Sequence, residues 1–560
     1  MARQHRWIAV ALLASVLAAT TTRSTAQPGP TAPDVRPSVA APSLDSLWSH
    51  LQVLGADAME GRGTGSRGAE RAAAYIASTL RRLGVTPLGG VDSFHQPVPM
   101  RGSRPLAGSR LRLVVDDRAD TLRLADDYVL YSTGAKTRIA APAPLVFAGY
   151  GIVAPEYDYN DYLSIDVNGA IAVIVSGEPP SDDPAFFDAD RPTRHADSEH
   201  KHRVALAQGA LGTFLLPLER HHPEQSWDDW QRTFAFEHVT LLYDIPRNLN
   251  LVMNLGTARQ LFQDAPYSLD AIRAMDRDGT MQSFRLRVHA DFAGQFDERV
   301  FLAPNVAGLL EGSDPLLRDS YVLLSAHYDH LGIGPPIRGD AIYNGVLDNA
   351  VGCAALLEIA RTLSPASRRP ASSLVLLFTV GEEKGLLGAR HYTAHPLVPL
   401  HRTIANLNID GLSSIDAFDD VIGVGAELST LGDHLRHVAG DLGLEVSPIP
   451  DVFHDIDAFT RSDQLAFAQA GIPSILVMGG FRFRHISTEQ GLEAFIQWGA
   501  KRYHSPFDDL TQPLNGDAML QHTMVLLACV EQLAGTYTVP QWLPGSSFST
   551  ARLRSIAERR

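Results

Sequence analysis

The sequence predicts an α/β fold with a mostly parallel central sheet, covered by helices on both faces, and a mainly β insert. From about residue 300 onward, apolar segments of strand length alternate with amphipathic segments of helical length. These strand segments are apolar without alternation, as a sheet covered on both faces requires. Between residues 116 and 295 the pattern changes to short β-like runs separated by acidic, proline-rich or histidine-rich loops.

The individual elements can be placed from the same patterns. A helix is expected over residues 67–83, where apolar residues recur at helical spacing before Gly84. In the inserted region, strands are expected at 143–152 and 170–175. In the later half we expect strands at 321–326, 373–380, 403–409 and 474–478, and helices at 350–363 and 385–395.

The N-terminus has the pattern of a secretory signal peptide. Arg3 and Arg6 precede an apolar run over residues 7–19, and small residues come just before Gln27. The run is short for a membrane span, which needs about 20 residues, although an uncleaved anchor is an alternative. The expected segments are a signal peptide at 1–26, a linker at 27–42, the main domain at 43–115 and 296–540, an insert at 116–295, and a tail at 541–560.

Charge and cysteine content exclude several classes of protein. The 560 residues carry a formal net charge of −15, which becomes −18 once the three arginines of residues 1–26 are removed. Binding to nucleic acid through general electrostatics is not expected, because phosphate contacts need clustered Lys and Arg. No later segment predicts a membrane span, so no stable membrane insertion is expected after signal cleavage. Cys353 and Cys529 lie in apolar helical patterns and are expected as buried free thiols, with a disulfide between them as the alternative in an exported protein.

Acidic and imidazole residues follow three predicted strands, and one more acid precedes a predicted helix. Ligands of open parallel sheets bind just beyond the carboxyl ends of the strands. Each residue alone has an ordinary explanation as a turn residue or helix cap. A cluster of like charges at one edge is nevertheless costly unless a cation lies among them. The residues are His327 and Asp329 after the first strand, Glu382 and Glu383 after the second, Asp410 after the third, and Asp348 before the helix.

This donor set is typical of a catalytic metal site. Zinc accepts imidazole nitrogen and carboxylate oxygen and leaves a position open for chemistry. His327 and Asp329 point the same way if the strand continues, so the aspartate is expected to fix the imidazole tautomer. His330 competes for the ligand role, but strand alternation directs it away. Of the adjacent Glu382 and Glu383, one is expected to bind metal and the other to transfer protons, with a solvated acidic turn as the alternative.

Six motifs resemble those of a known family and occur in the same order. They are SAHYDHLG, GVLDNAVGCAALLEIAR, LFTVGEEKGLLGARHY, NLNIDG, RSDQLAFAQAGIPSILV and KRYHSPFDDL. Residues 300–535, with a lead-in near 45–100, resemble the di-zinc aminopeptidases of the bacterial leucyl aminopeptidase and aminopeptidase Y family. The resemblance implies a zinc exopeptidase fold with two zinc ions per chain.

The same resemblance implies a role for each residue. Glu382 would be the general base, and Asp329 would support a metal-binding imidazole. His504 is indicated only by its place in the motif YHSPFDD. Ser462-Asp463-Gln464 departs from the Ser-Asp-His of many relatives, so changed substrate contacts are expected there. The implied ligands are His327 and Asp410 for one zinc, Glu383 and His504 for the other, and Asp348 between the two.

The insert resembles a protease-associated domain, on the segments VFAGYGIVAPEYDYNDYLSIDVNGAIAVIVSGEPP and HRVALAQGALGTFLL. The resemblance implies an exported aminopeptidase, periplasmic or extracellular, that acts on peptides by a two-zinc, glutamate general-base mechanism. A carboxypeptidase, a glutaminyl cyclase and a receptor-like binding module without chemistry are the alternatives. A serine hydrolase is not indicated, because no GxSxG motif occurs.

Overall fold

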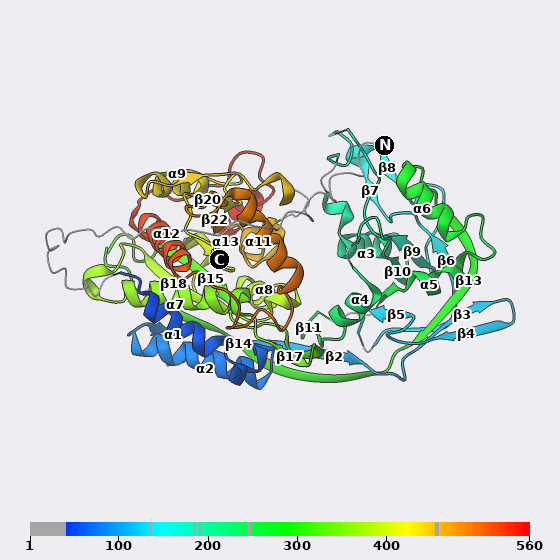
Figure 1. Ribbon diagram of the computed structural model, residues 1–560, viewed down its shortest axis with the longest axis horizontal. Helices are drawn as coiled ribbons and strands as arrows, with labels where there is room; N and C mark the ends of the chain where they lie inside the picture. Colours follow the sequence, from blue (N-terminus) through cyan, green and yellow to red (C-terminus); the bar gives the residue numbers. More distant parts are fainter. Residues whose placement is uncertain are drawn as a thin grey trace, which may run out of the picture. The chain divides into compact units, whose positions relative to one another are not determined.

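The protein is described from a computed structural model, whose elements are labelled in Figure 1. The structure describes residues 41–559 apart from 132, 135, 184, 190–191, 224, 245–247 and 454–457. The expected signal peptide and all but the last two residues of the expected linker lie outside the described residues.

The larger sheet has ten strands among the described residues, in the order β11-β2-β14-β18-β15-β19-β22-β20-β21, with β1 beside β14. Its four central strands, β18, β15, β19 and β22, are parallel to their neighbours within that set. Their bounds are Tyr321–His327 for β15, Ser373–Thr379 for β18, Thr403–Asn408 for β19 and Ser474–Gly479 for β22. The outer strands are β1 Thr86–Pro87, β2 His95–Pro105, β11 His238–Leu241, β14 Phe296–Leu310, β20 Asp420–Val424 and β21 Glu445–Val446.

The α/β class is confirmed, but the sheet is mixed and only its centre is parallel. The two long strands β2 and β14 run antiparallel to each other, with Phe296 opposite Pro105. β14 is antiparallel to β18, and β20 is antiparallel to β22. The antiparallel pairs therefore flank the parallel core.

Helices cover both faces of this sheet. Val322 and Leu324 of β15 share a buried cluster with α1, α2, α7, α9 and α12, whereas Leu323 shares another with α8 and α10. Successive residues of a strand point to opposite faces, so the two clusters lie on opposite sides of the sheet. The bounds are α1 Leu44–Leu54, α2 Arg67–Arg82, α7 Val351–Leu363, α8 Leu387–Ala394, α9 Leu431–Asp441, α10 Gln464–Gln469, α11 Thr488–Lys501, α12 Gly516–Gly535 and α13 Ser549–Glu558.

The smaller sheet has eight strands among the described residues, in the order β4-β3-β13-β6-β9-β10-β12-β5. β6, β9, β10 and β12 are parallel, and α3, α4, α5 and α6 accompany them. Their bounds are β3 Arg110–Val115, β4 Arg118–Leu122, β5 Tyr128–Leu130, β6 Arg138–Phe147, β9 Ile171–Val175, β10 Gly212–Leu216, β12 Leu249–Met253, β13 Phe284–Ala293, α3 Ser198–Ala207, α4 Trp227–Thr233, α5 Leu255–Ala258 and α6 Leu269–Asp278. Two short hairpins, β7 Val153–Ala154 with β8 Tyr159–Asn160 and β16 Gly332–Ile337 with β17 Asp340–Tyr343, complete the strands.

The sheet pairing differs from the expected segments in two places. β3 pairs with β4 and β13, so residues 110–115 lie in the smaller sheet and not in the main domain. β11 lies within the expected insert yet pairs with β2 of the larger sheet. The segment before and through β11 therefore brings part of the insert against the main domain.

The expected tail packs onto the main domain. The Trp542 indole Nε1 donates to Gly471 O at 3.0 Å, and Arg552 Nη1 donates to Leu400 O and Thr403 O at 3.1 and 3.0 Å. Residues 541–559 are thus held against β19 and α10. Among the described helices, none is both long enough and apolar enough to cross a membrane.

Candidate metal centre

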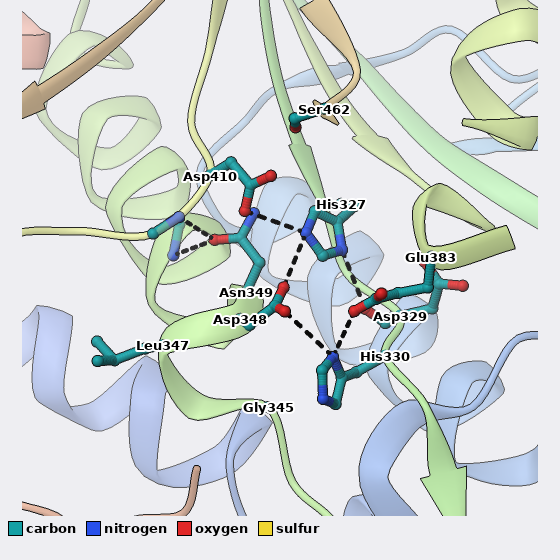
Figure 2. Close-up of polar contacts among 12 residues, drawn as sticks. His327, Asp329, His330, Gly345, Leu347, Asp348, Asn349, Glu383, Asp410 and Ser462 are labelled. Carbon is teal, nitrogen blue, oxygen red and sulfur yellow. Dashed lines mark hydrogen bonds and ion pairs between the residues drawn. The ribbon is translucent and has the colours of Figure 1, made fainter. Parts of the chain in front are cut away.

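The register of the central strands brings the predicted residues to one edge of the sheet. His327 lies opposite Thr379 of β18, so Glu382 and Glu383 follow just beyond the same level. Ser325 lies opposite Asn408 of β19, so Asp410 also comes just past the strand end. Figure 2 shows the side chains of His327, Glu383 and Asp410 around Asp348, which precedes α7.

One group of donors surrounds the imidazole of His327. Its Nε2 lies 3.3 Å from Asp348 Oδ1 and 3.3 Å from Asp410 Oδ1. The His327 side chain is buried, with 1% of its surface exposed, whereas the Asp410 side chain is 22% exposed. The three ligand atoms are close enough to hold one cation among them.

A second group shares the other oxygen of Asp348. His504 Nε2 lies 3.2 Å from Asp348 Oδ2 and 3.0 Å from Glu383 Oε2. His504 follows α11 with a φ of 51°, and its ring stacks on that of Tyr503 at 3.8 Å. The structure therefore brings His504, far along the chain, to the four residues at the sheet edge. Asp348 lies between the two groups, as a bridging carboxylate would.

His330 also belongs to the second group, which the alternation argument did not anticipate. Its Nδ1 lies 2.6 Å from Glu383 Oε1 and 3.8 Å from Asp348 Oδ2 (Figure 2). The prediction that His330 points away was wrong, because β15 ends at His327 and strand alternation does not continue beyond it. Two imidazoles, those of His330 and His504, thus face the two oxygens of Glu383.

Asp329 contacts His327 differently from the prediction. His327 Nδ1 lies 3.1 Å from the backbone oxygen of Asp329, not from its carboxylate. The carboxylate Oδ2 instead accepts hydrogen bonds from Thr64 Oγ1 at 2.5 Å and from Gly381 N at 2.7 Å. The chain turns after His327, so the carbonyl faces the ring while the carboxylate holds the start of the loop that carries Glu382 and Glu383.

Glu382 borders a cavity of about 940 Å³ beside the two groups. Burial raises the pKa of Glu382 well above its ordinary value, with Glu383 and Asp410 adding to the shift against the opposing effect of His327. The cavity is open to ligands and has a largely apolar wall. Apolar residues that line it include Ile415, Val424, Leu476, Met478, Phe481, Phe483, Phe495, Trp498 and Leu514.

The electrostatics of the cluster fit bound cations. Burial lowers the pKa of His327 and of His504, but the surrounding carboxylates outweigh it and raise both pKa values well above the ordinary range. Burial raises the pKa of Asp348, yet the facing imidazoles hold that pKa well below its usual value. Several carboxylates around a few imidazoles attract positive charge, and nitrogen and oxygen donors at these separations suit divalent zinc.

Two residues that the sequence did not single out hold the loops of the centre. Arg62 is 1% exposed and donates to Tyr328 O from Nε and to Gly345 O from Nη2, both at 2.7 Å. The buried carboxylate of Asp508 accepts from the backbone N–H groups of Leu347 and Asp348 at 2.9 and 3.1 Å. Arg62 thus holds the backbone next to His327, and Asp508 holds the backbone at Asp348.

Gln464 does not take the place expected of it. It is fully buried, its Oε1 accepts from Asn408 Nδ2 at 2.8 Å, and its Nε2 donates to Phe459 O at 2.9 Å. Ser462 and not Gln464 lines the cavity. Gln464 therefore belongs to a buried hydrogen-bond network under the site, and changed substrate contacts at this segment stay a prediction.

Comparison with known proteins agrees with this geometry. Residues 305–530, which include all five predicted ligands, match peptidase family M28. A stretch of 86 residues is 37% identical to a vacuolar membrane protease of Verticillium alfalfae and covers 15% of this chain but 8% of that protein. Two of the curated relatives, including one from Paracoccidioides brasiliensis, are each matched over only 8% of their length.

Solved structures resemble nearly the whole chain. An aminopeptidase from Aneurinibacillus sp. strain AM-1 has a TM-score of 0.54 and 18% identity, covering 89% of this chain and 95% of that chain. A zinc aminopeptidase from Bacillus subtilis has a TM-score of 0.46 and 17% identity, covering 89% and 96%. The first likeness shows the fold.

Proposed function

We propose that this chain is an exported zinc aminopeptidase that removes residues from the N-termini of peptides, because residues 305–530 match peptidase family M28. The observation that carries the proposal is the pair of carboxylate–imidazole groups sharing Asp348 beside an open cavity. The imidazole and carboxylate donors of the two groups support the choice of zinc.

We assign the two zinc ions from the contacts of the side chains. His327 and Asp410 would hold one ion, His504 and Glu383 the other, and Asp348 would bridge them. When bound, two such ions supply Lewis-acid polarisation of the scissile carbonyl and stabilise the negative charge that develops on its oxygen.

The protein's own groups supply the proton transfers. Glu382 borders the cavity without belonging to either donor group, so its carboxylate is free to accept a proton from the attacking water. Glu382 then delivers that proton to the departing nitrogen, and the peptide bond breaks. The apolar wall of the cavity would exclude water around a bound substrate, and the free N-terminal amine would bind at the acidic end of the cavity, which Asp410 borders.

His330 is the second candidate for the ligand role assigned to His504. We propose that His330 orients Glu383 through its short contact to Oε1, while His504 binds the ion. On this assignment, His504→Ala lowers the zinc content from two towards one per chain, whereas His330→Ala keeps two ions that bind more weakly. The opposite pattern of zinc contents would exchange the two roles.

The activity is tested with three substrate classes assayed on the same zinc-loaded sample. Free aminoacyl anilides should be cleaved, whereas N-blocked peptides should be inert and N-terminal glutaminyl peptides should be hydrolysed without cyclisation. Cleavage of blocked peptides alone would indicate a carboxypeptidase. No turnover with any substrate, in protein that holds zinc, would favour a binding module.

The proposal also includes export and the nature of the insert. The N-terminal pattern at residues 1–26 supports cleavage before Gln27, which the intact mass of the mature protein would test. The smaller sheet, with its parallel centre and accompanying helices, is proposed as a protease-associated domain on the sequence resemblance of residues 146–180.

A further inference from the structure

A paired arginine and glutamate join the insert to the main domain near the metal centre. Glu237 immediately precedes β11, and Arg299 lies on β14. Arg299 Nε donates to Glu237 Oε1 at 2.8 Å, and Nη2 donates to Oε2 at 2.6 Å. The Glu237 side chain is 13% exposed and that of Arg299 is 44% exposed, so the carboxylate is partly shielded while the guanidinium reaches solvent, and the contact has the bidentate geometry that orients an arginine.

The same guanidinium reaches the turn before α2. Arg299 Nη1 donates to Gly65 O at 2.8 Å, and Nη2 lies 3.3 Å from Thr64 O. The guanidinium also lies over the ring of Phe301, 4.0 Å from its centre. Gly65 has a φ of 66°, so the turn has a shape that depends on glycine and on the contacts around it. Glu237 thus orients an arginine that fixes this turn.

The turn at Thr64 and Gly65 also contacts the metal centre. Thr64 Oγ1 donates to Asp329 Oδ2, which also accepts from Gly381 N. The backbone oxygen of Asp329 faces His327 Nδ1, and Gly381 begins the loop that carries Glu382 and Glu383. One carboxylate therefore links the Thr64 turn to a predicted ligand and to the loop of the predicted base.

We propose that Arg299, held by Glu237 of the insert, is a positioning residue for the metal centre, acting through Thr64 and Asp329. The inference rests on the proposed zinc function. It assigns the insert a specific part in that function: a carboxylate from the segment before β11 completes the support of Asp329. Loss of any link lets Asp329 move, and with it the imidazole of His327.

The test measures zinc affinity on the purified full-length chain by competition with a chromophoric chelator, together with kcat and KM. Partners behind metal ligands typically contribute about 10–100-fold to metal affinity. We expect Thr64→Val to weaken zinc binding about tenfold, and Arg299→Met, one step further away, by about three- to tenfold. Both should lower kcat more than they change KM, and Arg299→Lys should recover part of the loss.

A double variant separates the relay from general destabilisation. If Arg299 acts through Thr64, Arg299→Met combined with Thr64→Val should weaken zinc binding little more than Thr64→Val alone, since contacts in one network are not additive. Arg101→Met is the matched control, because Arg101 of β2 forms a comparable ion pair at 3.4 Å with Glu298, the neighbour of Arg299 on β14. When Arg101→Met is combined with Thr64→Val, the fold-loss in zinc affinity should equal the product of the two single losses.

Three results would overturn the inference. In the first, Arg299→Met lowers the thermal midpoint while zinc affinity and kcat stay within twofold of the parent, which would make its role structural only. In the second, the double variant shows the full product of the two single effects. In the third, the parent chain binds no zinc, which would also end the proposed function; zinc binding without turnover would end only the aminopeptidase assignment.

Discussion

Both sheets of the chain place ionisable side chains beyond the carboxyl ends of parallel strands. In the smaller sheet, Asp276 Oδ1 accepts from Tyr150 Oη at 2.8 Å and faces His221 Nε2 at 2.9 Å and Arg220 Nη1 at 3.3 Å. Lys201 Nζ donates to Val175 O at 2.9 Å and to Gly177 O. Here each charge has partners supplied by the protein.

The edge of the larger sheet differs in its balance of charge. Four carboxylates, of Asp348, Glu382, Glu383 and Asp410, lie there with imidazoles as their main partners. Imidazoles are neutral at ordinary pH unless carboxylates hold their protons. Ionisable side chains at the ends of parallel strands therefore do not by themselves indicate a metal site. A metal site is indicated where the carboxylates outnumber the positively charged groups that the protein supplies, so that a bound cation is needed to balance their charge.

The largest expected effect comes from the predicted base. Glu382→Gln should lower turnover by about two or more orders of magnitude while zinc content stays near two per chain, because a proton acceptor is lost without a ligand. Steady-state kinetics with elemental analysis of the same sample would measure both. Glu493→Gln, an exposed residue of α11, is the control and should leave turnover unchanged. Near-parental turnover in Glu382→Gln would refute the base assignment.

Removal of the shared carboxylate should break the larger-sheet centre itself. Asp348→Ala should lower zinc content below one per chain, because both donor groups lose an oxygen. Asp416→Ala is the matched control: its carboxylate pairs with His485 at 2.9 Å away from the centre, so zinc content should stay near two. Two tightly held ions in Asp348→Ala would contradict the shared role.

Removal of a buried carboxylate should have a different effect in the smaller sheet, where it should lower stability and leave zinc content unchanged. Asp276→Asn should lower the free energy of unfolding by about 3 kcal/mol, since breaking a buried charge pair strands its partners. Zinc content should not change, because the site neutralises itself. Urea unfolding with metal analysis tests this contrast. A loss of zinc without loss of stability would reverse the interpretation of the two sheets.

The smallest expected effect is a pH dependence carried by Lys201. Burial lowers the pKa of Lys201 to about 7, against an ordinary value of 10.5. Between those values the unfolded chain binds more protons, so stability rises with pH, by about 1 kcal/mol from pH 7 to pH 8. Lys201→Met lacks this gain, so over that interval the parent should gain about 1 kcal/mol of stability relative to the variant. Parallel urea curves at the two pH values would contradict the lowered pKa.

The centre of the larger sheet was predictable, whereas its flanks were not. β15, β18, β19 and β22 are continuous apolar runs and fall within two residues of the expected bounds. β2 contains Pro97 and Pro99, which argue against a strand inside a sheet. The structure accommodates them because β11 pairs only with residues 100–103, which leaves the prolines at an unpaired side.

Some residues of the candidate site could be predicted from the local sequence pattern, whereas others depend on contacts between distant parts of the chain. His327, Glu383 and Asp410 follow apolar strands, so their common edge could be predicted from local pattern. His504 required the family motif, because its loop is positioned by α11 and not by a strand. Arg62 and Thr64 were missed, since their contacts join residues more than 260 positions apart, and no periodicity reports such contacts.

The two thiols of the chain provide a further use of the structure. Cys353 and Cys529 are both free and buried, and Cys353 Sγ lies 3.1 Å from His327 O. The sequence contains no other cysteine, and neither lies in the smaller sheet. The rate at which an alkylating reagent labels the native protein therefore measures how often the main domain opens transiently. Labelling of Cys353 measures openings next to His327.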